Sequence, residues 1–147
     1  MSGKFKMEDK EIIKLLKRIY SKTILILDDD PYQIEILKTA INEIDQNIQI
    51  DTTGNPEVAI KNIKERNTKG NLYDVVICDI ELNSYLSGFE VIQFCKKKYP
   101  NIQTILISSN KKEKYENRYA FKKAQDEFLN KPISLRALYQ KLEPILV

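Results

Sequence analysis

Five polar residues stand where short apolar stretches of the sequence end, and their side chains could share one chemistry. They are Asp28, Asp29, Asp79, Ser108 and Lys131. Three carboxylates gathered without a cation would repel one another and raise one another's pKa, so the set calls for a metal ion. Oxygen ligands alone favour Mg²⁺, which commonly keeps some waters and binds a few carboxylates together with phosphate oxygens. The acids therefore predict a magnesium site.

The other two side chains would supply what a metal ion does not. The ammonium group of Lys131 can pair with one phosphoryl oxygen, and the hydroxyl of Ser108 can donate to another. Among these groups, the carboxylate of Asp79 would attack phosphorus and become an acyl phosphate. Taken alone, Asp79 is explained at least as well as an acid that caps the loop leaving a strand.

Strands and helices that alternate along the sequence would position these residues. Apolar runs predict strands at 23–27, 48–52, within 72–82, at 103–107 and at 127–130. Capping residues and periodic apolar positions predict helices at 31–44, 56–66, 89–98 and 111–124, and a last helix capped by Ser134. In this last helix we expect an inward face formed by Leu135, Leu138, Leu142 and Ile145.

Five strands alternating with five helices predict an α/β fold, because right-handed crossovers give an open parallel sheet covered on both faces. We expect the flavodoxin-like, doubly wound (βα)5 fold with strand order 2-1-3-4-5. In that order strands one, three, four and five are neighbours, so the polar residues at their carboxyl ends share one crevice.

An additional amphipathic helix is predicted at 9–20, before the first strand and outside the alternation. Packing on the domain is the favoured interpretation, and pairing with a partner helix or a remnant of a linker are alternatives. We therefore divide the chain into an N-terminal helix or linker at 1–21 and one domain at 22–147.

Composition restricts the chemistry and the partners. The 147 residues contain no histidine, which excludes a Ser-His-Asp triad, a Cys-His pair, histidine-based zinc sites and a histidine phosphocarrier. The net charge is only +3 and the lysines are spread over several helices, so we expect no direct nucleic-acid binding. No apolar run approaches the roughly 18 residues that span a membrane, so we expect a cytoplasmic protein. Cys78 and Cys95 are interpreted as buried thiols.

The sequence resembles the receiver domain of two-component response regulators over roughly residues 22–147. The resemblance rests on five markers in the expected order, which are ILILDDDP at 24–31, VVICDIEL at 75–82, Gly88, ILISS at 105–109 and FLNKPI at 128–133. It implies that Asp28 and Asp29 bind Mg²⁺, and that Asp79 accepts a phosphoryl group from a histidine kinase or a phosphotransfer protein.

The resemblance also implies roles for the remaining site residues. The backbone carbonyl of Glu81 would bind the metal ion, Ser108 and Lys131 would contact the phosphoryl group, and the Lys131–Pro132 peptide bond would be cis. Phe128 matches the aromatic switch position of the family, although a lone aromatic residue on a strand is equally well explained as core.

A two-state switch follows from this resemblance. Phosphorylation adds about two negative charges, and Ser108 moving toward them would open space for Phe128 to turn inward. The face of helix four, strand five and helix five would then change its preference for a downstream protein or a second copy of the chain. Candidate contacts on that face are Tyr115, Tyr119, Lys122 and Lys123, for which a solvated helix is the simpler interpretation.

The loop after Asp79 departs from the family pattern. Asn83 stands where proline is frequent, Ser87 stands where an acidic residue often precedes the glycine, and the interval from Asp79 to Gly88 is one residue longer than usual. The shape of this loop, the lifetime of the phosphorylated state and the matching kinase are therefore open.

Two other functions fit part of the pattern. A phosphatase of the haloacid-dehalogenase type would use a D-x-D motif, and Asp28 and Asp30 have that spacing, but Tyr32 replaces the usual Thr or Val and no acidic pair follows Lys131. A receiver-like interaction module would keep the fold without taking phosphate. No output domain follows the last strand and helix, so the chain is either a stand-alone regulator or a fragment of a larger protein.

Overall fold

The computed structural model describes residues 8–13, 21–82, 84–110 and 127–146. Five parallel strands form one sheet in the order β2-β1-β3-β4-β5. Their bounds are β1 Thr23–Leu27, β2 Gln49–Thr53, β3 Val75–Asp79, β4 Gln103–Ser108 and β5 Glu127–Asn130. The predicted flavodoxin-like α/β fold and its strand order are therefore confirmed.

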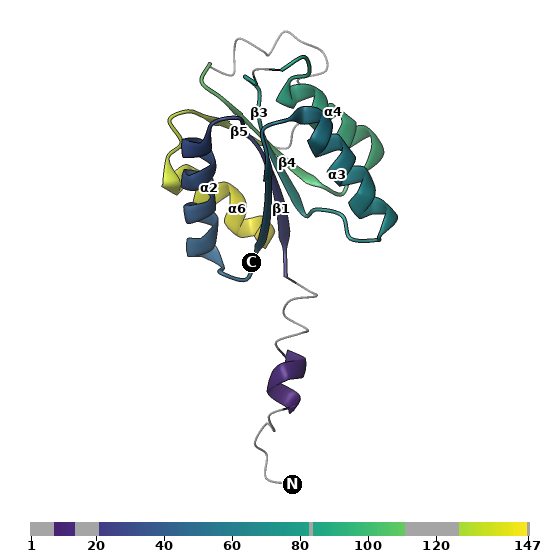
Figure 1. Cartoon of the computed structure of the whole chain (residues 1–147). Coiled ribbons are helices and arrows are strands. Elements are labelled where there is room, and N and C mark those ends of the chain that lie inside the picture. Colours follow the sequence, from purple (N-terminus) through teal and green to yellow (C-terminus); the bar gives the residue numbers. More distant parts are fainter. Residues whose placement is uncertain (1–7, 14–20, 83, 111–126, 147) are drawn as a thin grey trace.

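Helices cover both faces of this sheet (Figure 1). On one face lie α2 (Pro31–Ile44) and α6 (Leu135–Leu146), and on the other lie α3 (Pro56–Thr68) and α4 (Gly88–Lys98). Residues 8–13 are also helical, and Ile12 within them is exposed. The predicted helix at 111–124, with Tyr115, Tyr119, Lys122 and Lys123, lies outside the described residues, as does the second half of the predicted helix at 9–20. No helix in the described part of the chain is long and apolar enough to cross a membrane.

The middle residues of the central strands are mostly apolar because the two core clusters take alternate residues from them. Ile24 and Ile26 of β1 pack into the cluster under α2 and α6, whereas Leu25 and Leu27 pack into the cluster under α3 and α4. Successive side chains of a strand point to opposite faces, so a strand between two helical layers has no polar face. The continuous apolar runs in the sequence thus correspond to strands buried on both sides.

Local capping sets the starts of the helices. Asp30 accepts a hydrogen bond from the backbone N–H of Tyr32 at 3.0 Å, and Asn55 accepts one from that of Glu57 at 2.8 Å. Ser134 accepts one from Ala137 at 3.2 Å. Each cap satisfies a backbone donor that has no partner within its helix, so these predicted starts hold. The predicted second strand is displaced by one residue, from 48–52 to 49–53.

The expectation that Leu135 faces inward is wrong. Leu138 and Leu142 are fully buried and Ile145 packs against the core, but Leu135 is 57% exposed. Ile133 packs against the core at this end of the sheet instead, so the first turn of α6 lies beyond the core. Leu135 lines a shallow hollow with Tyr32 and Ile36 of α2.

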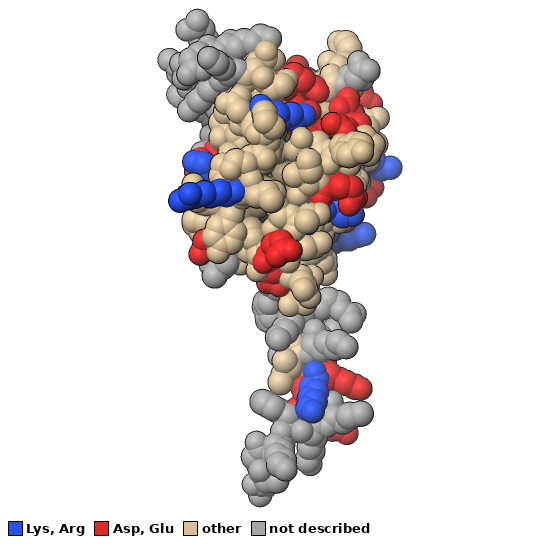
Figure 2. All heavy atoms as spheres, turned by 90° about the vertical axis from the view of Figure 1, so that its left-hand side faces the viewer, with Lys and Arg blue, Asp and Glu red and all other residues tan. Residues whose placement is uncertain are grey.

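On the face shown in Figure 2, charged side chains of both signs are scattered among uncharged ones.

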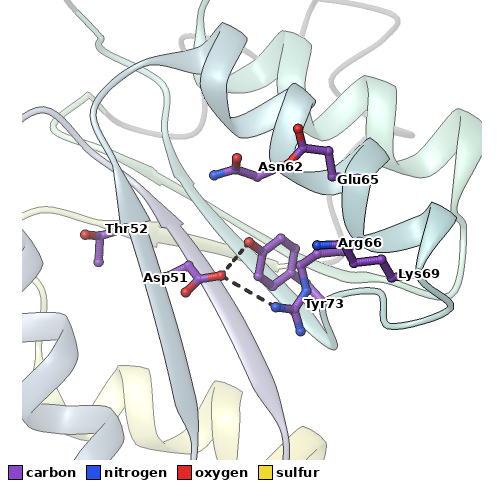
Figure 3. A pocket seen from close by; sticks show the side chains of 7 residues that line it. All are labelled: Asp51, Thr52, Asn62, Glu65, Arg66, Lys69 and Tyr73. Carbon is purple, nitrogen blue, oxygen red and sulfur yellow. Dashed lines mark hydrogen bonds and ion pairs between the residues drawn. The ribbon is translucent and has the colours of Figure 1, made fainter.

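A separate polar contact ties the edge strand β2 to the rest of the domain (Figure 3). The hydroxyl of Tyr73 donates to Asp51 at 2.7 Å, and the guanidinium of Arg66 lies 3.6 Å from the same carboxylate and 4.4 Å from the centroid of the Tyr73 ring. The three residues border an open hollow of about 350 Å³. None of the five polar residues singled out from the sequence lines this hollow, so we interpret the contact as structural.

Candidate functional site

Three acids meet at the carboxyl end of the sheet. Asp28 follows β1 directly and Asp79 is the last residue of β3, and these carboxylates are only 1% and 2% exposed. Since β1 and β3 pair in parallel, with Leu27 opposite Cys78, the two strands end side by side. One carboxylate oxygen from each of Asp28, Asp29 and Asp79 lies within 4.8 Å of the others. The sheet thus brings together the acids predicted to share a crevice.

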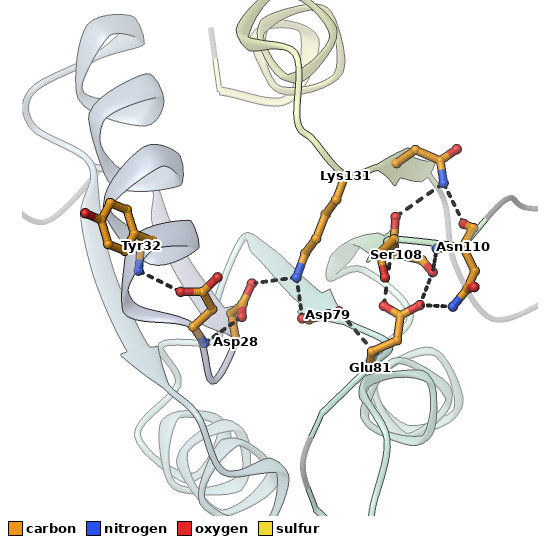
Figure 4. A network of polar contacts seen from close by, with 10 residues as sticks. Asp28, Tyr32, Asp79, Glu81, Ser108, Asn110 and Lys131 are labelled. Atoms are coloured by element: carbon orange, nitrogen blue, oxygen red, sulfur yellow. Dashed lines mark hydrogen bonds and ion pairs between the residues drawn. The ribbon is translucent and has the colours of Figure 1, made fainter.

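Lys131 reaches this group from the turn after β5 (Figure 4). Its ammonium group donates to Oδ2 of Asp79 at 2.6 Å and lies 3.6 Å from Oδ2 of Asp28. The backbone N–H of Lys131 donates to the carbonyl of Ser108 at 2.8 Å, which fixes the start of the turn against β4. The Lys131–Pro132 peptide bond is cis, as the resemblance implied.

Burial is the main cause of the shifted pKa values of the two acids in this site. Burial raises the pKa of the Asp79 carboxyl to about 7, although the hydrogen bond from Lys131 opposes this rise. Burial also raises the pKa of Asp28, against the backbone hydrogen bond from Asp30. Burial lowers the pKa of Lys131, but its hydrogen bond and charge interaction with Asp79 outweigh that effect, so the net shift is upward. One ammonium group therefore serves two buried carboxylates.

The oxygens of Asp28 and Asp79 indicate where a cation would bind. Oδ1 of Asp28 accepts the N–H of Asp30 at 2.9 Å, and Oδ1 of Asp79 accepts that of Glu81 at 3.0 Å. Oδ2 of Asp28 is buried and has no hydrogen-bond partner among the described residues, because 3.6 Å to Lys131 is too long for a hydrogen bond. A buried carboxylate oxygen left open beside two more acids fits a hard divalent cation such as Mg²⁺.

Ser108 is buried at the end of β4, and its hydroxyl donates to the side chain of Glu81. The same carboxylate accepts the side-chain amide of Asn110 at 2.8 Å and the backbone N–H of Ser109 at 3.3 Å. From the sequence we expected only a backbone role for Glu81, and Asn110 was not among the predicted site residues. The feature that could have indicated both is their position, two residues after Asp79 and two residues after Ser108.

Gly88 packs directly against Asp79. A Cβ atom at position 88 would stand 1.9 Å from the carbonyl oxygen of Asp79, so no other residue fits without moving the backbone. The preceding Ser87 forms a capping box with Glu90, which gives the unexpected serine a role at the start of α4. Asn83 lies outside the described residues.

Phe128 is partly buried and packs against the cluster under α3 and α4. It pairs with Leu106 of β4, and β4 lies between Phe128 and the strand that ends on Asp79. This position is compatible with a core residue and with a switch, so both interpretations remain predictions.

Comparisons with known proteins identify one family and two curated relatives that this chain resembles. The model of the family described as "Response regulator receiver domain" matches residues 24–143. The chain is 29% identical over 126 residues to the 3',5'-cyclic-nucleotide phosphodiesterase regA of Dictyostelium discoideum, a match that covers 84% of this chain and 15% of that protein. It is 27% identical over 125 residues to the probable transcriptional regulatory protein TcrX of Mycobacterium tuberculosis, covering 84% and 49%. The chain thus spans half or less of these curated relatives.

Solved structures with the same fold include two that are informative here. Response regulator protein TrrA of Thermotoga maritima, in complex with Mg(2+)-BeF, is 32% identical with a TM-score of 0.69, and the match covers 85% of this chain and 99% of that chain. A CheY-like response regulator receiver domain protein of Methanospirillum hungatei JF-1 is 19% identical with a TM-score of 0.70, covering 86% and 94%, and it supports the fold alone.

Proposed function

The chain belongs to the family of response regulator receiver domains, and from this premise we propose that residues 22–147 take a phosphoryl group onto Asp79 from a histidine kinase or a phosphotransfer protein. The observation that carries the proposal is the buried carboxylate of Asp79, which stands 2.6 Å from Lys131 and beside Asp28 and Asp29. A receiver domain is a signalling domain, so we propose no turnover of an external substrate.

In the proposed reaction a carboxylate oxygen of Asp79 attacks phosphorus and forms the O–P bond of an acyl phosphate. The P–N bond of the donor's phosphohistidine breaks, and its electron pair stays on the imidazole nitrogen. Lys131 follows the transferred group, because its ammonium already donates to the attacking carboxylate. When bound by the three acids and the carbonyl of Glu81, Mg²⁺ would supply positive charge to the phosphoryl oxygens.

Phosphorylation of Asp79 would change the neighbouring surface that binds partners. We propose that Ser108 donates to the phosphoryl group, that Phe128 responds, and that the face containing β5 and α6 then changes its preference for a downstream protein or a second copy of the chain. TrrA was solved with Mg(2+)-BeF, which supports the use of Mg²⁺ in this chain as well.

A phosphatase is disfavoured by the position of Asp30. The D-x-D motif of such an enzyme would need this acid beside Asp28, but its carboxylate caps α2 through the N–H of Tyr32. An interaction module with the fold but no phosphorylation stays as the alternative.

Intact mass spectrometry after incubation with Mg²⁺ and acetyl phosphate tests the proposal. We expect a single-phosphoryl adduct that is absent in Asp79→Asn and retained in Glu57→Gln, which removes an exposed acid of α3. An adduct that survives in Asp79→Asn would place the acceptor elsewhere. No adduct in the parent protein at any donor concentration would favour the interaction module.

A further inference from the structure

The carboxylate of Glu81 gathers three donors from consecutive residues at the end of β4. It accepts the hydroxyl of Ser108, the backbone N–H of Ser109 and the side-chain amide of Asn110. The sequence separation between Glu81 and these residues is 27 to 29, so the contacts join the loop after β3 to the loop after β4. Figure 4 shows Glu81 between Asp79 and this second loop.

These contacts fix the direction in which the Ser108 hydroxyl donates its proton. A serine hydroxyl has one proton and can donate it to one acceptor at a time. That proton is directed at Glu81, while the backbone N–H of Asn110 donates to the hydroxyl oxygen at 2.9 Å and fixes its orientation. Among the described residues, the Ser108 hydroxyl is thus oriented by the Asn110 N–H that donates to it and by the Glu81 carboxylate that accepts from it, with no phosphoryl group present.

The second loop is fixed from its other side by Asn130. The side-chain amide of Asn130 donates to the carbonyl of Asn110 at 2.6 Å and to that of Ser108 at 3.3 Å. Asn130 is the last residue of β5 and directly precedes Lys131, so this contact holds Asn110 against the end of the strand that leads to the lysine proposed to bind the phosphoryl group. The bond to Glu81 is the contact that Ser108 has to break in order to donate elsewhere.

We propose that Glu81 is a positioning residue that latches Ser108 in the unphosphorylated protein, so that a phosphoryl group on Asp79 gains the Ser108 hydroxyl only by taking it from the Glu81 carboxylate. This inference rests on the proposed function of Asp79. The Glu81 carboxylate, which is always present, and the phosphoryl group, which is present only after phosphorylation, compete for the Ser108 hydroxyl. The acceptor that this hydroxyl binds distinguishes the two states of the switch.

The strength of the latch follows from its charge. A hydrogen bond to an ionised carboxylate is roughly twice as strong as one between neutral groups. Replacing Glu81 with glutamine keeps an acceptor of the same shape but removes the charge, and should release Ser108 more easily. We expect Glu81→Gln to raise the rate of adduct formation from acetyl phosphate about tenfold, a change that corresponds to about 1.4 kcal/mol.

A double-mutant cycle separates the latch from simple repulsion between Glu81 and the phosphoryl group. The four proteins are the parent, Glu81→Gln, Ser108→Ala and the double variant, each assayed by intact mass with saturating Mg²⁺ and acetyl phosphate. Because no hydroxyl remains to be released in Ser108→Ala, the effect of Glu81→Gln should shrink there to less than about threefold. A structural role for Glu81 would not produce this dependence on Ser108.

Each outcome decides the inference. Coupling between the two positions supports the latch, whereas an equal acceleration with and without Ser108, or none in either, overturns it. Glu90→Gln serves as a matched control, since it removes a charge next to the same loop, keeps the capping box with Ser87 and should leave the rate unchanged. If the parent protein forms no Asp79-dependent adduct, the proposed function itself fails, which differs from a parent that forms the adduct but shows no coupling.

Discussion

Lys131 donates to Oδ2 of Asp79 at 2.6 Å across 52 residues of sequence, and the same ammonium group lies 3.6 Å from Oδ2 of Asp28. One cation therefore bridges the last residue of β3 and the residue after β1. This ammonium group therefore contacts two of the three carboxylates that are proposed to hold a metal ion.

Removal of Lys131 should have opposite effects on metal binding and on phosphorylation. The ammonium group competes with Mg²⁺ for Asp28 and Asp79, so Lys131→Ala should bind Mg²⁺ several-fold more tightly. The same change removes a partner of the phosphoryl group and should slow adduct formation about tenfold or more. Magnesium titration by NMR and intact mass would measure the two effects. Lys141→Ala, which breaks a surface pair with Glu127, is the control, and equal behaviour of the two variants would contradict the prediction.

Magnesium should stabilise the folded protein through the three acids. A ligand that binds only the folded state adds about 1.4 kcal/mol at ten times its dissociation constant. Thermal unfolding of the parent should therefore shift upward with Mg²⁺, and Asp29→Asn should reduce the shift, since it removes one of the three carboxylates. A shift of the same size in Asp29→Asn and in the exposed control Glu57→Gln would show that Mg²⁺ acts elsewhere.

The stability of the metal-free protein should fall as pH rises through about 7. The pKa of Asp79 is about 7 in the folded protein against an ordinary value of 3.8, so between these values the folded protein binds a proton that the unfolded chain has lost. The stabilisation is complete below the ordinary pKa and is lost as pH rises through the folded pKa. Asp79→Asn carries no such proton and should be more stable than the parent near pH 8, on the order of 2 kcal/mol, with little difference near pH 4.

Urea unfolding in a chelator at several pH values measures this effect. The difference between Asp79→Asn and the parent should shrink steadily as pH is lowered. A difference that is the same across the range would mean that Asp79 does not titrate in the folded protein as described.

Alanine at position 88 should disturb the acceptor itself. Its Cβ would meet the carbonyl oxygen of Asp79 at 1.9 Å and the carbonyl carbon at 2.7 Å, so the strand end or α4 must move. We expect Gly88→Ala to cost on the order of 3 kcal/mol of stability and to reduce phosphorylation. Gly70→Ala is the comparison, because Gly70 has φ of 68° but no atom within reach of a Cβ, and should cost only about 1 kcal/mol without affecting phosphorylation.

Both cysteines should resist modification while the protein is folded. Cys78 and Cys95 are fully buried, and burial raises the pKa of Cys95 to about 12 and that of Cys78 well above its ordinary value. A thiol reagent at neutral pH should label neither residue in native protein and both in denaturant, with mass spectrometry as the measurement. Rapid labelling of the native protein would contradict the described packing.

The sequence alone determined the succession of strands and helices along the chain and the polar residues at which the strands end. Apolar runs such as 75–78 mark strands buried on both faces, and pairs such as Asp30 with Pro31 mark helix starts. These signals are local, because each depends on residues within one strand or one turn. Because strands that alternate with helices form a parallel sheet, Asp28, Asp79 and Lys131 are expected at the same edge, where the carboxyl ends of the strands lie.

Only the tertiary structure decided which side chains meet at that edge. The exposure of Leu135 depends on Ile133 filling the core before α6 begins, and the contact of Glu81 with Ser108 depends on how two loops 27 residues apart face each other. The ion pair of Lys131 with Oδ2 of Asp28 and the close approach of Gly88 to Asp79 are likewise contacts between distant segments. The periodicity of a sequence gives the face on which a residue lies, but hydrogen bonds and close packing depend on distances that the assembled sheet and helices set.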